Sequence, residues 1–183
     1  MLSVTWRQIA RRIRVPLGFA FTALYLWVAR PTAESMLVGA ALIIPGLAIR
    51  ALASGHVQKN ERLTTTGPYA YTRNPLYLGS LILAVGFAIS ARNWWVGAGL
   101  VLIFLAIYLP VIRGEEAFLR EHFPEFAQYE RQVPRLLPRV SSFGDARGEF
   151  SWDLYWKHRE YNATLGSAAL LAALIAKLIL VSR

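Results

Sequence analysis

"GPYAYTRNPLYLGSLILAVGFAISA", residues 67–91, joins a dense group of polar and aromatic residues to an uncharged apolar run. The opening Gly-Pro pair is typical of a turn, Asn74 suits the N-cap of a helix, and Pro75 suits the first helical turn. From Asn74 to Ala91 the chain contains no Asp, Glu, Lys or Arg. The stretch therefore predicts a helix that enters a lipid bilayer, with several polar side chains gathered at the depth where it enters.

Uncharged runs recur along the whole chain. Its 183 residues are 55% hydrophobic and 17% charged, with a mean hydropathy of +0.37, whereas a soluble domain typically has about 25% charged residues. A bilayer core needs roughly 20 apolar residues, and shorter runs reach that length when a flanking Arg or Lys snorkels to the interface. Five segments qualify: 15–29, 35–49, 74–91, 93–112 and 161–176. We therefore predict an all-α integral membrane bundle of five transmembrane helices.

The basic residues predict how this bundle is oriented, because positive charge collects on the cytoplasmic side of membrane proteins. If the N-terminus is cytoplasmic, four of the 20 Lys and Arg residues fall on the far side: Arg30, Arg92, Lys177 and Arg183. We therefore predict a cytoplasmic N-terminus and a bacterial inner-membrane location. The basic residues are expected to bind anionic lipid headgroups rather than nucleic acid.

The N-terminal residues 1–14 form a basic amphipathic segment without a signal cleavage site, and we expect this segment to lie at the membrane interface. The chain has no cysteine. Disulfides, Cys-zinc sites and thiol nucleophiles are thereby excluded, and the sequence predicts no metal site.

A second polar segment, "RGEEAFLREHFPEFAQYERQVPRLLP" at residues 113–138, follows the 93–112 run directly. Glu115 and Glu116 leave the predicted membrane together, and paired carboxylates there are costly unless water or cations compensate them. One interpretation is a helix that simply continues into water. The other is a ligand site at the cytoplasmic face, where the connections are long and rich in polar residues.

Taken together, the two polar segments resemble the isoprenylcysteine carboxyl methyltransferase family, which is grouped with the phospholipid N-methyltransferases. The resemblance covers roughly residues 35–139. It is carried by Gly67, Pro68, Tyr69, Arg73, Asn74, Pro75, Tyr77, Gly79, Glu115, Glu116, Tyr129, Arg135, Leu136 and Pro138. Many carboxyl methyltransferases have His where this chain has Asn74, an Asn that the phospholipid N-methyltransferases share, and residues 140–183 extend beyond the usual end of the family.

The resemblance implies S-adenosylmethionine as cofactor, in a cytosol-facing pocket between residues 67–79 and 113–138. The implied catalytic residues are Arg73, Asn74 and Glu116. The implied cofactor-binding residues are Tyr71, Asn74, Pro75, Tyr77, Gly79, Glu115, Glu116, Tyr129, Arg135 and Leu136. Their chemistry suits this ligand, because carboxylates accept from hydroxyl or ammonium groups, arginine pairs with a carboxylate, and a tyrosine ring stabilises a nearby cation. A Rossmann cofactor site is not supported, since no G-x-G-x-x-G motif is present.

We therefore expect a membrane methyltransferase whose lipophilic acceptor enters from the bilayer, with carboxyl O-methylation of an isoprenoid- or lipid-like molecule favoured. The alternatives are a phospholipid amine N-methyltransferase, an NADPH-dependent sterol-type reductase and a non-catalytic lipid-binding protein. An amine acceptor needs a base, for which the histidines and the two glutamates are candidates. The predicted organisation is the interfacial segment 1–14, a methyltransferase core at 15–139, and an extension at 140–183 with an interfacial aromatic segment and the fifth helix.

Overall fold

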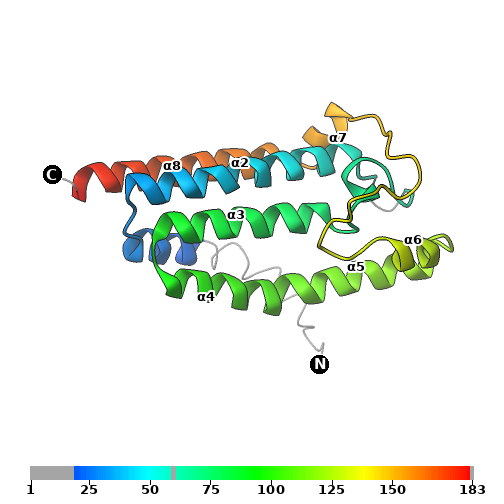
Figure 1. The fold of residues 1–183 in the computed structure, drawn as a ribbon, viewed down its shortest axis with the longest axis horizontal. Helices are drawn as coiled ribbons and strands as arrows, with labels where there is room; N and C mark the ends of the chain where they lie inside the picture. The colour runs from blue at the N-terminus through cyan, green and yellow to red at the C-terminus, as the bar shows by residue number, and fades with distance from the viewer. Residues whose placement is uncertain (1–18, 59–60, 182–183) are drawn as a thin grey trace, which may run out of the picture.

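The computed structural model describes residues 19–58 and 61–181, and within these ranges every regular element is a helix. The longer helices are α2 (Ala33–His56), α3 (Pro75–Ala91), α4 (Trp94–Ile103), α5 (Leu109–His122) and α8 (Tyr161–Val181). They run roughly along one axis, with α2 and α8 on one side, α3 in the middle and α4 with α5 on the other (Figure 1). The short helices α6 (Phe126–Gln132) and α7 (Trp152–Lys157) lie at one end. The predicted all-α class is confirmed for the described residues.

Three helices in the described part of the chain are long and apolar enough to cross a membrane: Ala33–His56, Trp94–His122 and Tyr161–Leu180. The second is one continuous helix, because α4 passes into α5 through a π-helical turn at Phe104–Tyr108. Helix α3 has 17 residues, which is the lower limit of the length that a bilayer requires. A shorter apolar helix covers Phe19–Val28, and the start of the predicted first span lies outside the described residues. The count of five spans therefore stays a prediction.

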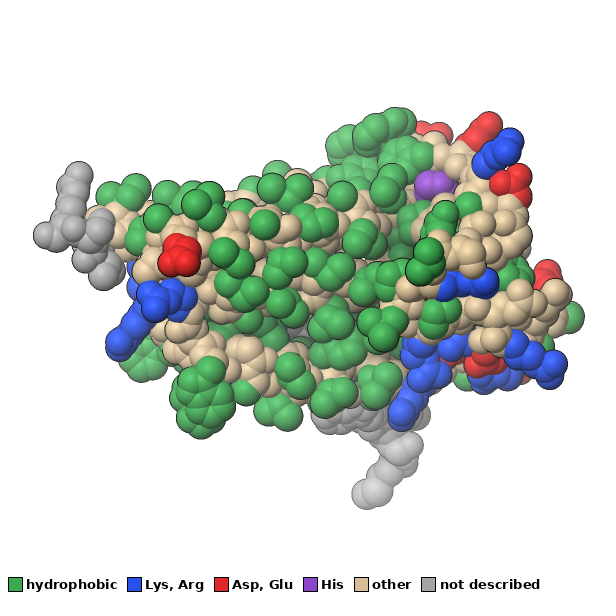
Figure 2. Space-filling view, viewed as in Figure 1, with side chains coloured by type: hydrophobic (Ala, Val, Ile, Leu, Met, Phe, Trp, Pro, Cys, Tyr) green, Lys and Arg blue, Asp and Glu red, His purple; other side chains and the backbone are tan. Residues whose placement is uncertain are grey.

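Polar and apolar side chains are segregated along the long axis of the bundle. Figure 2 shows a broad band of hydrophobic side chains over the helices on one face, with Lys, Arg, Asp and Glu gathered at the two ends. This distribution is expected of a bundle whose middle contacts lipid and whose ends contact water. The predicted side of the membrane for each end stays a prediction.

Helices α2 and α3 pack closely through two pairs of glycines. Gly39 faces Gly86 and Gly46 faces Gly79, so that both pairs repeat after seven residues on antiparallel helices. A Cβ added to Gly79 would lie 2.8 Å from the carbonyl oxygen of Gly46, and one added to Gly86 would lie 2.8 Å from that of Gly39. Small residues allow this approach, which supplies van der Waals contact where lipid offers no hydrophobic driving force. Gly79 thus faces α2.

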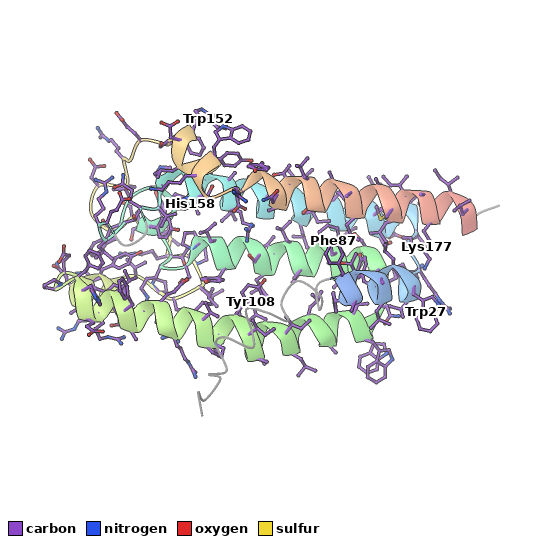
Figure 3. All side chains as sticks on the ribbon, turned by 180° about the vertical axis from the view of Figure 1, so that it is seen from behind. Trp27, Phe87, Tyr108, Trp152, His158 and Lys177 are labelled. Atoms are coloured by element: carbon purple, nitrogen blue, oxygen red, sulfur yellow. The ribbon has the colours of Figure 1, made fainter. Side chains whose placement is uncertain are left out.

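The helix α8 is attached to the helix Phe19–Val28 through the partly buried cation of Lys177. Lys177 Nζ donates to the backbone carbonyls of Leu26 and Trp27, the latter at 2.9 Å, and Figure 3 shows Lys177 and Trp27 at the same end of the bundle. Cations are favourable at the C-terminal end of a helix, where carbonyl groups lack partners. Lys177 therefore contributes a structural contact at this end.

At the opposite end, the two polar segments of the sequence are joined by backbone hydrogen bonds. The amide of Arg73 donates to the carbonyl of Pro134 at 3.0 Å, and the amide of Arg139 donates to the carbonyl of Tyr71 at 3.0 Å. Phe126, Tyr129 and Val133 form a small buried core beside this seam. The expectation that residues 113–138 fold back against residues 67–79 is met by these contacts.

Candidate functional site

A buried carboxylate organises the polar end of the bundle. Glu116 is 3% exposed and lies on α5 one turn after Ile112, the other buried residue of that helix. Its Oε1 accepts from Asn74 Nδ2 at 3.2 Å and lies 3.3 Å from Arg73 Nη2. Its Oε2 accepts from Arg135 Nε and Nη2 at 3.0 and 2.7 Å. A buried carboxylate is tolerated when cations and hydrogen bonds compensate the loss of water, and here two arginines and an amide do so.

Asn74 occupies the N-cap position of α3, yet its side chain makes no capping hydrogen bond. The predicted N-cap position is therefore confirmed, although the side chain does not form the hydrogen bond that usually makes Asn favourable there. Both N–H groups of its amide are used elsewhere, since Nδ2 donates to Glu116 Oε1 and, at 3.0 Å, to the carbonyl of Arg135. Asn74 consequently connects the start of α3, helix α5 and the segment after α6 at a single point.

Arg73 carries a buried donor that the protein leaves without a partner. Its Nη1 lies 3.1 Å from Glu130 Oε1, while Nη2 contacts Glu116. Its Nε is the one buried side-chain N or O atom, among the described residues, that has no hydrogen-bond partner. A buried unsatisfied donor costs about 1–3 kcal/mol. An acceptor atom of a bound molecule placed at this Nε would remove that cost.

The other glutamate of the pair faces outward. Glu115 is exposed, and its Oε1 accepts from the hydroxyl of Tyr77 at 3.1 Å. The Tyr77 ring packs edge to face on Tyr108, with 5.8 Å between the ring centroids. The two neighbouring carboxylates thus have different surroundings, since Glu116 is enclosed by the protein and Glu115 is open to a ligand.

The remaining residues implied by the resemblance fall into two groups. Tyr71 is 36% exposed, and Leu136 contributes its carbonyl, which accepts from Thr72 Oγ1 at 3.1 Å. Tyr129 and Pro75 are buried, and the Tyr129 hydroxyl donates to the carbonyl of Tyr69 at 2.7 Å. Burial raises the pKa of the Tyr129 hydroxyl, so this side chain stays neutral. Tyr129, Pro75 and Gly79 are therefore buried inside the protein, and their contact with a cofactor stays a prediction.

Two polar residues that sequence reasoning did not select belong to the same cluster. Thr72 is 2% exposed, and its hydroxyl contacts the carbonyls of Arg135 and Leu136 at 3.2 and 3.1 Å. Glu130 binds Arg120 at 2.6 Å as well as Arg73. The hydrogen bond from Arg120, followed by those from Arg73, lowers the pKa of the Glu130 carboxyl. Both residues lie inside the quoted polar segments, where Thr72 precedes Arg73 and Glu130 follows Tyr129. This position next to selected residues could have identified them from the sequence.

A second ion pair lies deeper in the bundle. Arg50 of α2 binds Glu160 through two hydrogen bonds, Nε to Oε1 at 2.6 Å and Nη2 to Oε2 at 3.0 Å. Sequence reasoning treated Arg50 as a snorkelling residue at the edge of a span. Its position at the end of an uncharged run could have predicted an ion pair, because ionisable residues at membrane depth usually have a specific partner.

The three histidines contact backbone carbonyls. The Nδ1 atoms of His56, His122 and His158 lie 2.7, 2.9 and 3.0 Å from the carbonyl oxygens of Leu52, Phe118 and Ser54. No group of three or more His, Cys, Asp or Glu side chains able to hold a metal ion occurs within residues 19–58 and 61–181. The Nδ1 contacts of His56 and His122 lie within their own helices, whereas that of His158 joins the residues after α7 to α2.

Comparison with known proteins gives a family match and several relatives. Residues 35–125 match the family described as phospholipid methyltransferase. The chain is 41% identical over 98 residues to the cobalt-zinc-cadmium resistance protein CzcN of Cupriavidus metallidurans, covering 54% of this chain and 44% of that protein. It is 40% identical over 86 residues to the nickel-cobalt-cadmium resistance protein NccN of Alcaligenes xylosoxydans xylosoxydans, covering 47% and 40%.

A more distant relative bears the name of the activity that the motifs imply. The chain is 29% identical over 101 residues to protein-S-isoprenylcysteine O-methyltransferase of Schizosaccharomyces pombe, covering 55% of this chain and 43% of that protein. The chain thus spans about two fifths of the length of these relatives. No solved structure matches it. The resemblance predicted from residues 67–138 is confirmed.

Proposed function

We propose that this chain, whose residues 35–125 match the phospholipid methyltransferase family, is an integral membrane S-adenosylmethionine-dependent methyltransferase with a lipophilic acceptor. The observation that carries the proposal is the pairing of the closed cluster Arg73, Asn74, Glu116 and Arg135 with the open pair of Tyr77 and Glu115. Both lie at one polar end of a bundle whose described residues include three candidate membrane spans. Such a position suits a reaction between a cytosolic cofactor and a molecule dissolved in the bilayer.

The residues fit the proposed cofactor. The orphaned Nε of Arg73 is a donor for the carboxylate of S-adenosylmethionine, and the exposed Glu115 is an acceptor for its ribose hydroxyls or its ammonium group. The ring of Tyr77, held on Tyr108, is an electron-rich neighbour for a sulfonium. When bound, the cofactor supplies a methyl group: the acceptor oxygen or nitrogen forms a bond to the methyl carbon, and the electron pair of the broken carbon–sulfur bond stays on sulfur.

Glu116 takes a positioning role in this proposal. Its two oxygens are already occupied by Arg73, Asn74 and Arg135. It therefore orients these three side chains, and a rigid, preorganised arrangement is the main contribution that a methyl transfer requires from the protein. The catalytic assignment of Arg73 and Asn74 remains part of the proposal, together with the binding roles of Tyr71 and Leu136.

Carboxyl O-methylation is the favoured reaction, with amine N-methylation as the second candidate. The whole motif set, and "VPRLLP" in particular, favours the first, whereas Asn74 favours the second. A carboxylate is a nucleophile without losing a proton at neutral pH, because its ordinary pKa is about 4. An amine acceptor must first be deprotonated by a base. The proposed active site faces the cytoplasm, from an inner membrane in which the N-terminus is cytoplasmic.

The experiment is methyl transfer from labelled S-adenosylmethionine to a total lipid extract by the detergent-purified chain, in single turnovers. A carboxylate acceptor gives a rate that is flat between about pH 6 and pH 9, and mild alkali releases the label as methanol. An amine acceptor gives a rate that rises with pH and a label that resists alkali. No calorimetric binding of S-adenosylmethionine and no transfer of label would overturn the proposed function.

A further inference from the structure

The segment between α6 and α7 crosses the polar end of the bundle, beside the connection from α2 to α3 (Figure 1). We name residues 139–151 of this segment the strap, and residues 67–71, which begin the first motif, the motif turn. The strap is held by backbone hydrogen bonds, which are, in chain order, Arg139 N to Tyr71 O at 3.0 Å, Phe143 N to Ala70 O at 2.9 Å, Gly67 N to Ala146 O at 2.9 Å and Ser151 N to Gly55 O at 2.9 Å. The strap therefore follows the motif turn backwards from Tyr71 to Gly67 and then reaches the last turn of α2.

Glycines allow the strap and the motif turn to lie very close to their neighbours. A Cβ added at Gly148 of the strap would lie 2.5 Å from Oγ1 of Thr66, the residue before the motif turn. A Cβ added at Gly67 would lie 2.5 Å from Cδ2 of His56, and Gly67 also has a φ of +57°, which residues with a side chain rarely adopt. These distances are too short for a carbon atom. The strap, the motif turn and the end of α2 therefore fit together only because these two positions lack a side chain.

Side chains fix the strap at two further places. Near its C-terminal end, Nε2 of His56 lies 3.2 Å from the carbonyl oxygen of Gly148, within hydrogen-bond distance. Nearer its start, the ring of Phe143 packs edge to face on Tyr129, with 5.3 Å between the ring centroids. The Tyr129 hydroxyl in turn donates to the carbonyl of Tyr69, inside the motif turn. The strap is therefore attached to α2, to α6 and to the motif turn.

The motif turn leads directly into the proposed cofactor site, because Arg73 and Asn74 follow it after one residue. The strap binds the carbonyls of Ala70 and Tyr71, and the amide of Arg73 donates to the carbonyl of Pro134. A shift of the strap would therefore move the backbone that carries both site side chains. A site whose groups are already in place loses less freedom on binding, and its affinity is higher for that reason.

We propose that the strap is a positioning element of the proposed cofactor site, and that Gly148 is the residue through which its position is set. The strap holds the motif turn, and the motif turn places Arg73 and Asn74 for S-adenosylmethionine. This inference rests on the proposed function. It extends cofactor binding to residues outside the family-matched range 35–125.

Gly148→Ala provides the test, because its Cβ would force the strap away from Thr66. Adding Thr66→Gly is the compensating change, since it removes the atoms that lie 2.5 and 2.7 Å from that Cβ and leaves Cδ2 of His56, at 3.2 Å, as the nearest neighbour. The side chain of Thr66 makes no capping hydrogen bond, so none is lost with it. Gly86→Ala is the matched control, because it introduces the same methyl group at a similarly tight contact between α2 and α3, outside the strap and the motif turn.

The measurements on the full chain in detergent are S-adenosylmethionine affinity by calorimetry, the unfolding temperature, and hydrogen–deuterium exchange of the amides of residues 67–73. Gly148→Ala should weaken S-adenosylmethionine binding about tenfold, because displaced groups must be reordered on binding. It should also speed exchange at residues 67–73, and adding Thr66→Gly should restore most of both. Gly86→Ala should lower the unfolding temperature and leave the affinity and this exchange unchanged.

An affinity of Gly148→Ala equal to that of the parent would overturn the proposal. An equal loss of affinity in Gly86→Ala would also overturn it, because lower stability alone would then account for the effect. An affinity that Thr66→Gly fails to restore would show that the contact between Gly148 and Thr66 does not set the site. If the parent binds no S-adenosylmethionine, the proposed function fails. Faster exchange at residues 67–73 in Gly148→Ala would then still show that the strap holds the motif turn, and unchanged exchange would overturn that as well.

Discussion

Glu115 and Glu116 are adjacent in the sequence, yet one is exposed and the other is 3% exposed. Successive residues of an α-helix point in directions about 100° apart, so one of two adjacent side chains can face the bundle while the other faces water. Sequence reasoning gave both carboxylates a contact with the cofactor. The structure separates them into an inner carboxylate that holds the arginines and an outer one that is open to a ligand.

This separation predicts different outcomes for the two glutamine variants. Glu115→Gln should weaken S-adenosylmethionine binding by about 1.5–3 kcal/mol, the value of one charge-assisted hydrogen bond, with little change in stability. Glu116→Gln should lower stability by about 3–5 kcal/mol, because it removes the buried carboxylate that pairs with Arg135 and leaves Arg73 with Glu130 as its remaining partner. Calorimetry and thermal unfolding of the two variants measure both effects. Equal unfolding temperatures for Glu116→Gln and the parent would contradict the structural role.

Arg73 leads to a second prediction, because its Nε is the buried donor without a partner. Lysine keeps the positive charge but lacks the planar fork of donors. Arg73→Lys should therefore weaken S-adenosylmethionine binding about tenfold, the loss of one hydrogen bond to a charged group. The exposed Arg131, two positions after the core residue Tyr129, supplies the control variant Arg131→Lys. An affinity for Arg73→Lys equal to that of the control would show that Nε does not contact the cofactor.

Glu130 predicts an acid-sensitive contribution to stability. Its pKa is lowered, chiefly by the hydrogen bond from Arg120 and also by Arg73. A carboxyl whose pKa is lower in the folded chain stabilises it above the unfolded pKa, and this contribution disappears as the pH falls through the folded pKa. The parent should therefore lose stability below about pH 4.5 more steeply than Glu130→Gln does. Thermal unfolding of both chains between about pH 6 and pH 3 makes the comparison, and parallel curves would contradict it.

At the scale of the elements, the glycine pairs between α2 and α3 determine how closely these helices approach. A Cβ at Gly86 would lie 2.8 Å from both the Gly39 carbonyl oxygen and Cγ1 of Ile43. Gly86→Ala should therefore destabilise the bundle by about 1–3 kcal/mol, the usual cost of overpacking a tight contact. Gly97→Ala, whose Cβ meets nothing within 4 Å, should leave the unfolding temperature unchanged or raise it. Equal effects in the two variants would show that α2 and α3 have room to separate.

For the whole molecule, the charged ends and the apolar band lead to a test of orientation. The test is to introduce a cysteine at each end of the bundle and label it. Ser35, at the start of α2, is a poor position for the cysteine, because it is 8% exposed and takes part in the capping box of that helix. Glu34 is exposed beside it, and Ser141 is exposed near the opposite end. Since the chain has no cysteine, Glu34→Cys and Ser141→Cys can each be labelled without background. An impermeant maleimide added to intact cells should label Glu34→Cys, and should label Ser141→Cys only after permeabilisation. The reverse pattern would place the proposed pocket on the outer face.

Several features of this protein could be predicted from the sequence because each depends on neighbouring residues. The length of an uncharged run decides whether a helix is suited to lipid, which is why Trp94–His122 and Tyr161–Leu180 overlap the predicted spans 93–112 and 161–176. The start of α3 at Pro75 follows from local backbone preference. The motifs at residues 67–79 and 113–138 identified the segments that form the polar cluster, since both carry more polar groups than a membrane anchor needs.

The tertiary structure alone decided which atoms within those segments contact each other. Asn74 has the local preference of a capping residue, but the buried carboxylate of Glu116 and the carbonyl of Arg135 take both of its N–H groups. Arg50 and Glu160 are 110 residues apart in the sequence, and the packing of α2, α3 and α8 makes them partners. Buried charges and donors must find partners wherever the fold brings them together, because little water is present to replace a missing one. That requirement is met in three dimensions, and no local pattern in the sequence encodes which partner meets it.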